Sequence, residues 1–205
     1  MALMETTKLI FIGSGGHARV LLSIAESNNS IKVEGVFDHN ETIKSLDGIE
    51  NFGGYSSDLF KEASAIIAIG DNQLRKTIAK TIDHSFGKLI HPTSLIERLS
   101  SIDVGSVVMH NAVIQRNTKI GKHCIINTSS NVDHDCVIGD FVHLAPNTTV
   151  CGGVTIGSGT LVGAAAVIIP QISIGSNVII GAGAVINKDV PDGATVVGNP
   201  GKIVN

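Results

Sequence analysis

The chain has no tryptophan, and only 3% of its 205 residues are aromatic. A core built on large rings is therefore excluded, and aliphatic side chains must fill the interior. Charged residues make up 16% of the chain and hydrophobic residues 43%. This composition predicts a folded protein. A length of 205 residues allows one large domain or two small ones.

Other features that the sequence lacks reduce the number of possible functions and locations. The three cysteines, Cys124, Cys136 and Cys151, are an odd number without Cys-x-x-Cys spacing, so we expect neither disulfides nor zinc, and a reducing cytoplasm fits. A formal net charge of −3 gives no reason to expect nucleic acid as a partner. No apolar run reaches about 18 residues, so no membrane span is expected. The segment Met1 to Lys8 lacks the apolar stretch of a secretory signal.

The sequence changes character near His91-Pro92. Beyond that point Ile, Leu or Val stands at every sixth position from Ile96 to Ile186, sixteen times in succession. Chance gives such a run with odds of roughly 10⁻⁷ or less. Ile-Gly also recurs every eighteen residues between Ile120-Gly121 and Ile174-Gly175, so three hexapeptides form one coil.

This period predicts a triangular parallel β-helix in which each face is a short strand and the aliphatic residues point inward. It resembles the left-handed β-helix of hexapeptide proteins. A sandwich of alternating strands is the alternative, which the strict register disfavours. The residue two places before each aliphatic is usually small, which leaves room at the corner, as at Thr118, Cys124, Ser130, Cys136, Thr148, Thr160, Ala166 and Ala184.

The first half alternates strand-like and helix-like segments. Lys8 to Ile12 predicts a buried strand, followed by the glycine-rich turn Gly13 to His17 and an amphipathic helix over Ala18 to Ser27. This order predicts a Rossmann-like mononucleotide-binding unit, half of a dinucleotide fold at most. Further strands are expected at 32–37, 63–69 and 88–90, and a second helix at 73–82.

Two features of this half suit a nucleotide. Gly13 to Gly16 place unhindered backbone N–H groups at a helix start, which favours a phosphate or diphosphate. Asp38 follows at the end of the second strand, where an acid can hydrogen-bond ribose or base. We therefore expect a nucleotide-binding domain over residues 1–91 and a β-helix domain over 92–205.

Histidine is rare in strands of this kind, yet the repeat region holds four. His134 projects outward near a corner between Asp133 and Asp135. A carboxylate beside an imidazole holds one tautomer and raises its basicity, as a general base requires, whereas the alternative is a solvated acidic turn. His143 lies half a coil further on, so spacing alone does not put it beside His134, but different faces of adjacent prisms meet in a trimer, where the two could line one cleft. The four are His110, His123, His134 and His143.

Cys124 and Cys136 occupy small-residue positions, so we interpret them as packing residues rather than nucleophiles. Cys151 precedes the pair Gly152-Gly153. These glycines are suited to present a backbone N–H to a carbonyl oxygen.

Together these motifs resemble hexapeptide-repeat sugar acetyltransferases of the sialic-acid O-acetyltransferase type, and more closely the bacterial nucleotide-sugar N-acetyltransferases. The resemblance implies acetyl transfer from acetyl-coenzyme A to the 4-amino group of a nucleotide-linked amino-deoxysugar. It also implies a homotrimer with sites between neighbouring helices. It spans nearly the whole chain and rests on Gly13 to His17, Ile69 to Asn72 with Arg75, His91-Pro92, Asn127 to Ser130, His134 to Gly139, Phe141 to His143 and Gly198 to Lys202.

The same resemblance assigns roles to residues. It implies His134 as catalytic base and Asp135 as the acid that tunes it, where relatives often carry Glu. The contacts it implies for acetyl-coenzyme A are Asn127, His143, Gly152, Ala164 and Ala182. Those it implies for the nucleotide sugar are Gly15, Gly16, His17, Asp38, His39 and Gly70.

Two other functions stay open on the residues alone. O-acetylation of sialic acid or a related sugar would use the same base and donor. A non-catalytic or metal-binding hexapeptide trimer would need three converging ligands such as His110, His134 and His143. The acids beside His134 and the nucleotide-binding half disfavour that reading, and we expect no metal. The sequence does not specify the sugar or its nucleotide.

Overall fold

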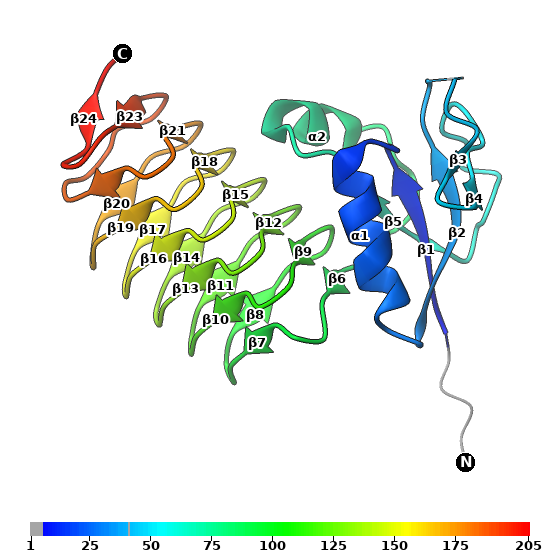
Figure 1. Cartoon of the computed structure of the whole chain (residues 1–205), viewed down its shortest axis with the longest axis horizontal. Coiled ribbons are helices and arrows are strands. Elements are labelled where there is room, and N and C mark those ends of the chain that lie inside the picture. Colours follow the sequence, from blue (N-terminus) through cyan, green and yellow to red (C-terminus); the bar gives the residue numbers. More distant parts are fainter. Residues whose placement is uncertain (1–5, 41) are drawn as a thin grey trace. The chain divides into compact units, whose positions relative to one another are not determined.

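The computed structural model describes residues 6–40 and 42–205, so the first five residues of the segment Met1 to Lys8 lie outside it. The chain divides into two compact units, one ending at Pro92 and one beginning at Thr93. The first is mixed α/β and the second is all β (Figure 1), which confirms the predicted fold class. Within the described ranges no helix is long and apolar enough to cross a membrane.

A three-stranded parallel sheet with strand order β2-β1-β5 organises the first unit. Its strands are β1 (Thr7–Ile12), β2 (Ile31–Phe37) and β5 (Ser64–Ile67). Helix α1 (Gly16–Glu26) connects β1 to β2 and buries its apolar stripe of Ala18, Leu21, Leu22, Ile24 and Ala25. The shorter elements are β3 (Ser45–Leu46), β4 (Ile49–Glu50), α2 (Asn72–Ile78) and β6 (Leu89–Ile90).

Helix α2 is shorter than the 73–82 that the sequence predicts. It ends at Ile78. Beyond it the N–H groups of Lys80 and Thr81 bond to carbonyls three residues back, which tightens the chain into turns. Ile78 and Ile82, whose four-residue spacing indicated a longer helix, both pack on the apolar cluster of β1 and β5. Tertiary packing therefore accounts for their spacing without a continuous helix.

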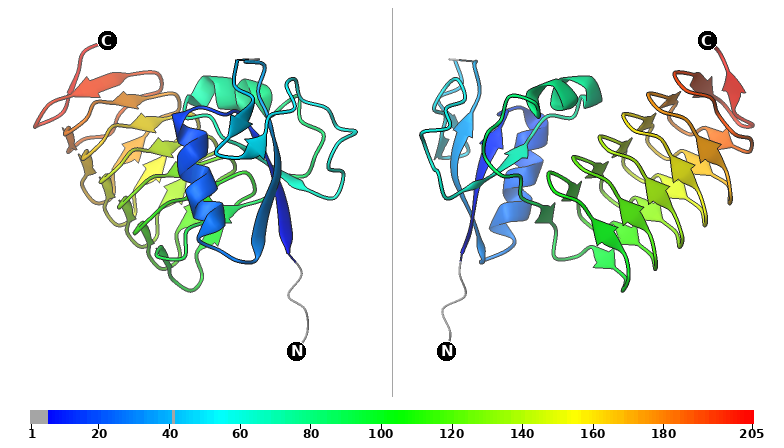
Figure 2. Two further views of the ribbon diagram at one scale, coloured as in Figure 1. Left: turned by 45° about the vertical axis from the view of Figure 1, so that its right-hand side comes forward. Right: turned by 180° about the vertical axis from the view of Figure 1, so that it is seen from behind.

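The second unit is a parallel β-helix of two-residue strands stacked on three faces (Figure 2). The first face stacks β7 (Leu95–Ile96), β10 (Val113–Ile114), β13 (Asn131–Val132), β16 (Thr149–Val150), β19 (Val167–Ile168) and β22 (Val185–Ile186). The second stacks β8 (Ser101–Ile102), β11 (Lys119–Ile120), β14 (Val137–Ile138), β17 (Thr155–Ile156) and β20 (Ser173–Ile174). The third stacks β9 (Val107–Val108), β12 (Ile125–Ile126), β15 (His143–Leu144), β18 (Leu161–Val162), β21 (Ile179–Ile180) and β23 (Thr195–Val197), to which β24 (Lys202–Ile203) adds antiparallel.

The inward aliphatic residues form vertical ladders, as the hexapeptide count predicts. Partners lie eighteen residues apart, so Ile114 pairs with Ile96 below and Val132 above. From Ile102 to Ile186 every ladder residue is at most 8% exposed, and only Ile96 in the first coil is half-buried. The interior is thus a continuous aliphatic column that needs no aromatic rings.

The small residues beside the ladders are all buried, and several of them also tie coils together. The Thr118 hydroxyl donates to the Asp133 carbonyl at 2.6 Å, and the Thr160 hydroxyl donates to the Gly175 carbonyl at 2.8 Å. Each bond reaches fifteen residues ahead into the following coil. The sequence indicated only that these side chains leave space, and the structure adds that they satisfy buried carbonyls.

Each corner of the prism turns through a residue with positive φ. One corner column holds Leu99, Asn117, Asp135, Gly153 and Gln171, at eighteen-residue intervals. Glycine and asparagine adopt this left-handed conformation more readily than other residues, and aspartate follows them. Asp135, at φ 58°, occupies one of these corners, so the corner geometry fixes the position of its backbone.

We expect Ile114→Ala to destabilise the β-helix by about 2–5 kcal/mol, because it opens a cavity in a fully buried ladder. Urea denaturation reports this change as a lower unfolding midpoint. Lys119→Ala, on an exposed position of β11, is the control and is expected to stay within about 0.5 kcal/mol of the parent. Equal midpoints for the two variants would contradict the column as the source of stability.

Candidate active site

The turn after β13, from Asp133 to Asp135, is fixed by the coils on both sides. The Asp135 N–H donates to the Arg116 carbonyl of the preceding coil at 3.1 Å. The His134 carbonyl accepts the Gly153 N–H of the following coil at 3.0 Å. The backbone is therefore immobilised while the His134 side chain stays 58% exposed. A rigid strand end that presents an exposed imidazole is a suitable support for chemistry.

The imidazole of His134 is bonded to the carboxylate of Asp135. Nδ1 lies 2.8 Å from Asp135 Oδ2, so the shorter Asp reaches the ring without a Glu. Because a carboxylate only accepts, this bond assigns the proton to Nδ1 and leaves a lone pair on Nε2. The hydrogen bond to Asp135, with the charge of Asp133, raises the pKa of His134 above its ordinary value. A neutral imidazole with a free Nε2 is the form that a general base requires.

Asn117 completes this arrangement, although the sequence did not single it out. Its Nδ2 donates to Asp135 Oδ1 at 2.6 Å from the coil below. That bond, followed by the bond from His134, holds the pKa of Asp135 below its ordinary value. Asn117 precedes Asp135 by eighteen residues, so the coil period was the signal that could have revealed it.

Gly152 leaves room for the imidazole. A Cβ on Gly152 would lie 2.8 Å from both Cε1 and Nε2 of His134, which is too close for any side chain. The ring of His134 therefore lies against the bare backbone of the next coil. This packing role differs from the role towards a carbonyl oxygen that the sequence suggested, and the latter stays a prediction.

His143 lies on β15, on a different face from the β13 turn that carries His134. Its Nε2 is 3.1 Å from Asn127 Nδ2, and the Asn amide is the donor in this bond. The structure thus brings together two of the residues expected to contact acetyl-coenzyme A. Ala164 and Ala182 are exposed and lie eighteen residues apart, in the corner turns that follow β18 and β21.

The remaining histidines and the cysteines differ in burial. His123 is buried and stacks on Phe141 with ring centroids 4.8 Å apart. Cys124 and Cys136 are fully buried, and burial raises the pKa of the Cys136 thiol. Cys151 is partly buried, and burial raises the pKa of its thiol as well. Over residues 6–40 and 42–205 no three His, Cys, Asp or Glu side chains are grouped to hold a metal ion.

In the first unit, the glycine-rich turn is open at the start of α1. Gly13 has φ +106° and passes so close to Ile69 that a Cβ would lie 2.8 Å from its Cγ1. Around Gly15 and Gly16 nothing lies within 4 Å of where a Cβ would be. No side chain caps the helix at Gly15. A helix start of this kind, without a side-chain cap, is suited to an anion.

Asp38 fastens this turn to the end of β2. Its Oδ2 accepts hydrogen bonds from the Ser14 backbone at 2.8 Å and hydroxyl at 2.7 Å, and its Oδ1 accepts the Asn40 N–H at 2.9 Å. Burial opposes ionisation, but these bonds prevail and hold the pKa of Asp38 below its ordinary value. The sequence suggested only contact with a ligand, and the structure adds this structural role.

The other expected nucleotide-sugar contacts differ in their surroundings. His39 is exposed and packs over Gly54, beside a hollow of about 110 Å³ that Phe37 and Tyr55 help to line. Gly70 is held by the buried guanidinium of Arg75, whose Nη1 donates to the Gly70 carbonyl at 3.1 Å. His17 lies half-buried in the first turn of α1.

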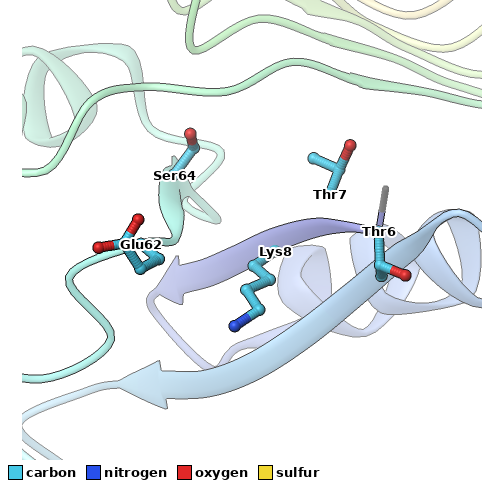
Figure 3. A pocket seen from close by; sticks show the side chains of 5 residues that line it. All are labelled: Thr6, Thr7, Lys8, Glu62 and Ser64. Carbon is cyan, nitrogen blue, oxygen red and sulfur yellow. The ribbon is translucent and has the colours of Figure 1, made fainter. Parts of the chain in front are cut away.

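Another hollow, of about 520 Å³, lies at the end of the sheet where β1 and β5 begin (Figure 3), whereas the glycine turn follows the other end of β1. Within it Lys8 is already paired, with Nζ 3.7 Å from Glu34. We assign this hollow no part in the site because it lies away from the glycine turn and Asp38. Its lining residues are Thr6, Thr7, Lys8, Glu62 and Ser64.

Comparison with known proteins defines the class. Residues 8–82 match the PglD N-terminal domain, and residues 117–152, 135–169 and 153–188 match the bacterial transferase hexapeptide. Perosamine N-acetyltransferase from Caulobacter crescentus, solved as a His-to-Asn variant with CoA and GDP-perosamine, is 31% identical with a TM-score of 0.92 over the whole of both chains. The acetyltransferase domain of PglB from Neisseria gonorrhoeae is 33% identical with a TM-score of 0.90, over 97% of this chain and all of that one.

Among curated proteins, UDP-N-acetylbacillosamine N-acetyltransferase of Bacillus subtilis is 34% identical over 110 residues. The match covers 48% of this chain, and the chain spans about half or less of the curated relatives it matches. The full-length structural matches confirm the resemblance that the motifs indicated. The chain belongs to the acetyl-CoA-dependent, hexapeptide-repeat sugar N-acetyltransferases that carry a PglD-type N-terminal domain.

Replacing Asn117 by Gly is expected to raise the pKa of Asp135, because it removes the bond that contributes most to lowering it. Glycine keeps the left-handed corner without strain, so the amide alone is tested. A carboxyl ¹³C NMR titration measures the change. Asn177→Gly, at a corner with φ 54° in another column, is the control. An unchanged Asp135 titration would show that the 2.6 Å bond does not persist in solution.

Proposed function

We propose that this chain transfers the acetyl group of acetyl-coenzyme A to the 4-amino group of a nucleotide-linked amino-deoxysugar, with His134 as general base. The observation that carries the proposal is the 2.8 Å bond between His134 Nδ1 and Asp135 Oδ2 on an immobilised, exposed turn. The full-length structural relatives include a perosamine N-acetyltransferase with CoA and GDP-perosamine bound, which supports both the donor and the type of acceptor.

In this mechanism Nε2 of His134 takes a proton from the amine while the amine nitrogen attacks the thioester carbonyl. The C–N bond forms and the C–S bond breaks. The imidazolium, stabilised by Asp135, returns its proton to the departing thiolate. The products are an amide and the free thiol of coenzyme A. No covalent enzyme intermediate is needed, because a thioester is already activated.

The donor and the acceptor occupy different parts of the chain in this proposal. The acetyl-coenzyme A contacts are the bonded pair Asn127 and His143, the backbone at Gly152, and the exposed Ala164 and Ala182. The nucleotide sugar is held in the first unit by the open turn and its neighbours, which are Gly15, Gly16, His17, Asp38, His39 and Gly70.

The positions of two histidines are consistent with the homotrimer that the family resemblance implies. His134 and His143 lie on different faces of one prism. If both act in one site, a neighbouring copy must supply one of them. We therefore propose a homotrimer with active sites between adjacent helices. The three free thiols fit a reducing cytoplasm, where we place the reaction.

The direct test is incubation with acetyl-coenzyme A and UDP-, GDP- or dTDP-linked 4-amino sugars, following thiol release. At least one amino sugar is expected to be acetylated, and His134→Ala is expected to reduce turnover by roughly 10²-fold or more. His110→Ala is the control, because the proposal gives His110 no role, whereas a histidine-bound metal would require it. Near-parental turnover of the His134 variant would refute the base, and acetylation of free sialic acid alone would favour the O-acetyl alternative.

The pH dependence follows from the raised pKa of His134. The base must be neutral, so kcat/KM is expected to fall as pH drops through a pKa that lies above the ordinary value of a histidine. Asp135→Asn removes the largest cause of that increase, and the acid limb should therefore move to lower pH. Asp103→Asn, which follows the inward Ile102 as Asp133 follows Val132, should leave the limb in place. The measurement is kcat/KM between about pH 5.5 and 9 for the parent and the two variants. An acid limb at the same pH in all three proteins would contradict the assignment of His134 as the base.

A further inference from the structure

Asp133 has no part in the mechanism above, yet its carboxylate lies beside the reacting nitrogen. Its Oδ1 is 3.9 Å from His134 Nε2. The same oxygen accepts the backbone N–H of His134 at 2.7 Å, which fixes the carboxylate relative to the ring. The Asp133 side chain is 37% exposed and that of His134 58%. Nε2 and Oδ1 therefore form two neighbouring acceptors that are open to a ligand.

The spacing of these acceptors suits an atom that carries two hydrogens. For an atom about 2.9 Å from both acceptors, the angle between its directions to Nε2 and Oδ1 is about 85°. An H–N–H group spans this angle with slightly bent hydrogen bonds. A carboxylate oxygen has lone pairs enough for a second bond beside the one from the His134 backbone. Nε2 accepts because the Nδ1 proton is directed at Asp135.

Amines and alcohols differ at such a pair. A primary amine donates one N–H to each acceptor and keeps its lone pair free for attack. An alcohol has a single O–H, so it leaves one of the two acceptors without a donor. Sites built to bind a specific hydrogen-bonding group discriminate strongly against analogues that lack it.

We propose that Asp133 Oδ1 and His134 Nε2 together hold the acceptor amine, and that Asp133 makes the site selective for an amino over a hydroxyl acceptor. The inference rests on the proposed function and deepens it. Of the two amine hydrogens, the one on Nε2 passes to His134 and then to the thiolate. The other stays on nitrogen, bonded to Asp133, and becomes the amide N–H of the product.

The test compares GDP-perosamine with its 4-hydroxy analogue as acceptors. If the parent enzyme uses another amino sugar of the panel, that sugar and its hydroxy analogue take their place. Rates are measured for the parent, Asp133→Ala and Asp133→Asn on the alkaline plateau of each protein's own kcat/KM profile, where a change in the pKa of His134 no longer affects the rate. Asp103→Asn is the matched control for the loss of one surface carboxylate.

Asp133→Ala is expected to lower kcat/KM for the amine by about 10- to 100-fold, the usual effect of losing a hydrogen bond to a charged group. This loss should appear as a higher KM for the amino sugar, with the KM for acetyl-coenzyme A unchanged. The ratio of amine to hydroxyl kcat/KM should fall with it. Asp133→Asn should show a smaller loss, because its Oδ1 still accepts a hydrogen bond.

Equal losses for both acceptors would overturn the inference, since Asp133 would then act only on the fold or on the base. Comparable use of both acceptors by the parent would overturn it too. Asp133→Asn keeps the bond to the His134 backbone, so it decides the matter if the Ala variant does not fold. Failure of the parent to acetylate any amino sugar would instead refute the proposed function.

Discussion

Backbone hydrogen bonding between residues eighteen apart is the constraint on which the β-helix depends. Each two-residue strand inside a stack pairs in register with strands one coil below and above, as β10 does through Ile114 with Ile96 and Val132. The same register places small residues over small residues and left-handed corners over left-handed corners. An aliphatic column forms without large rings because every layer has the same outline.

The candidate base depends on this register. The neighbours of His134 and Asp135 in the adjacent coils are Asn117 below and Gly152 above. Asn117 donates to the Asp135 carboxylate, and Gly152 leaves the space that the imidazole occupies. Three successive coils thus contribute an amide, an acid–imidazole pair and a bare backbone. The chemistry is set by stacking as much as by the local sequence.

The period explains which parts could be predicted from the sequence. The inward ladder and the small residues followed from counting by six, because each depends only on its place in a hexapeptide. The pairing of His134 with Asp135 followed from adjacency along the chain. Asn117 and the packing role of Gly152 were missed because they emerge only when residues eighteen apart are compared. In the first unit the expected helix over 73–82 was too long, since tertiary contacts of Ile82 do not require helical geometry. The roles assigned through family resemblance are still predictions.

The corner column that carries Asp135 has an evolutionary consequence. Every coil has the same three corner turns, and their outward side chains point away from the aliphatic column inside the prism. The side chains of one turn can therefore change without altering that column. Insertion of one complete coil elsewhere would lengthen the protein and leave the local surroundings of His134 unchanged, whereas insertion of a single residue would rotate every later side chain out of place. Such a scaffold tolerates change in whole modules, and new acceptor specificities can arise on it while the rest of the prism is inherited intact.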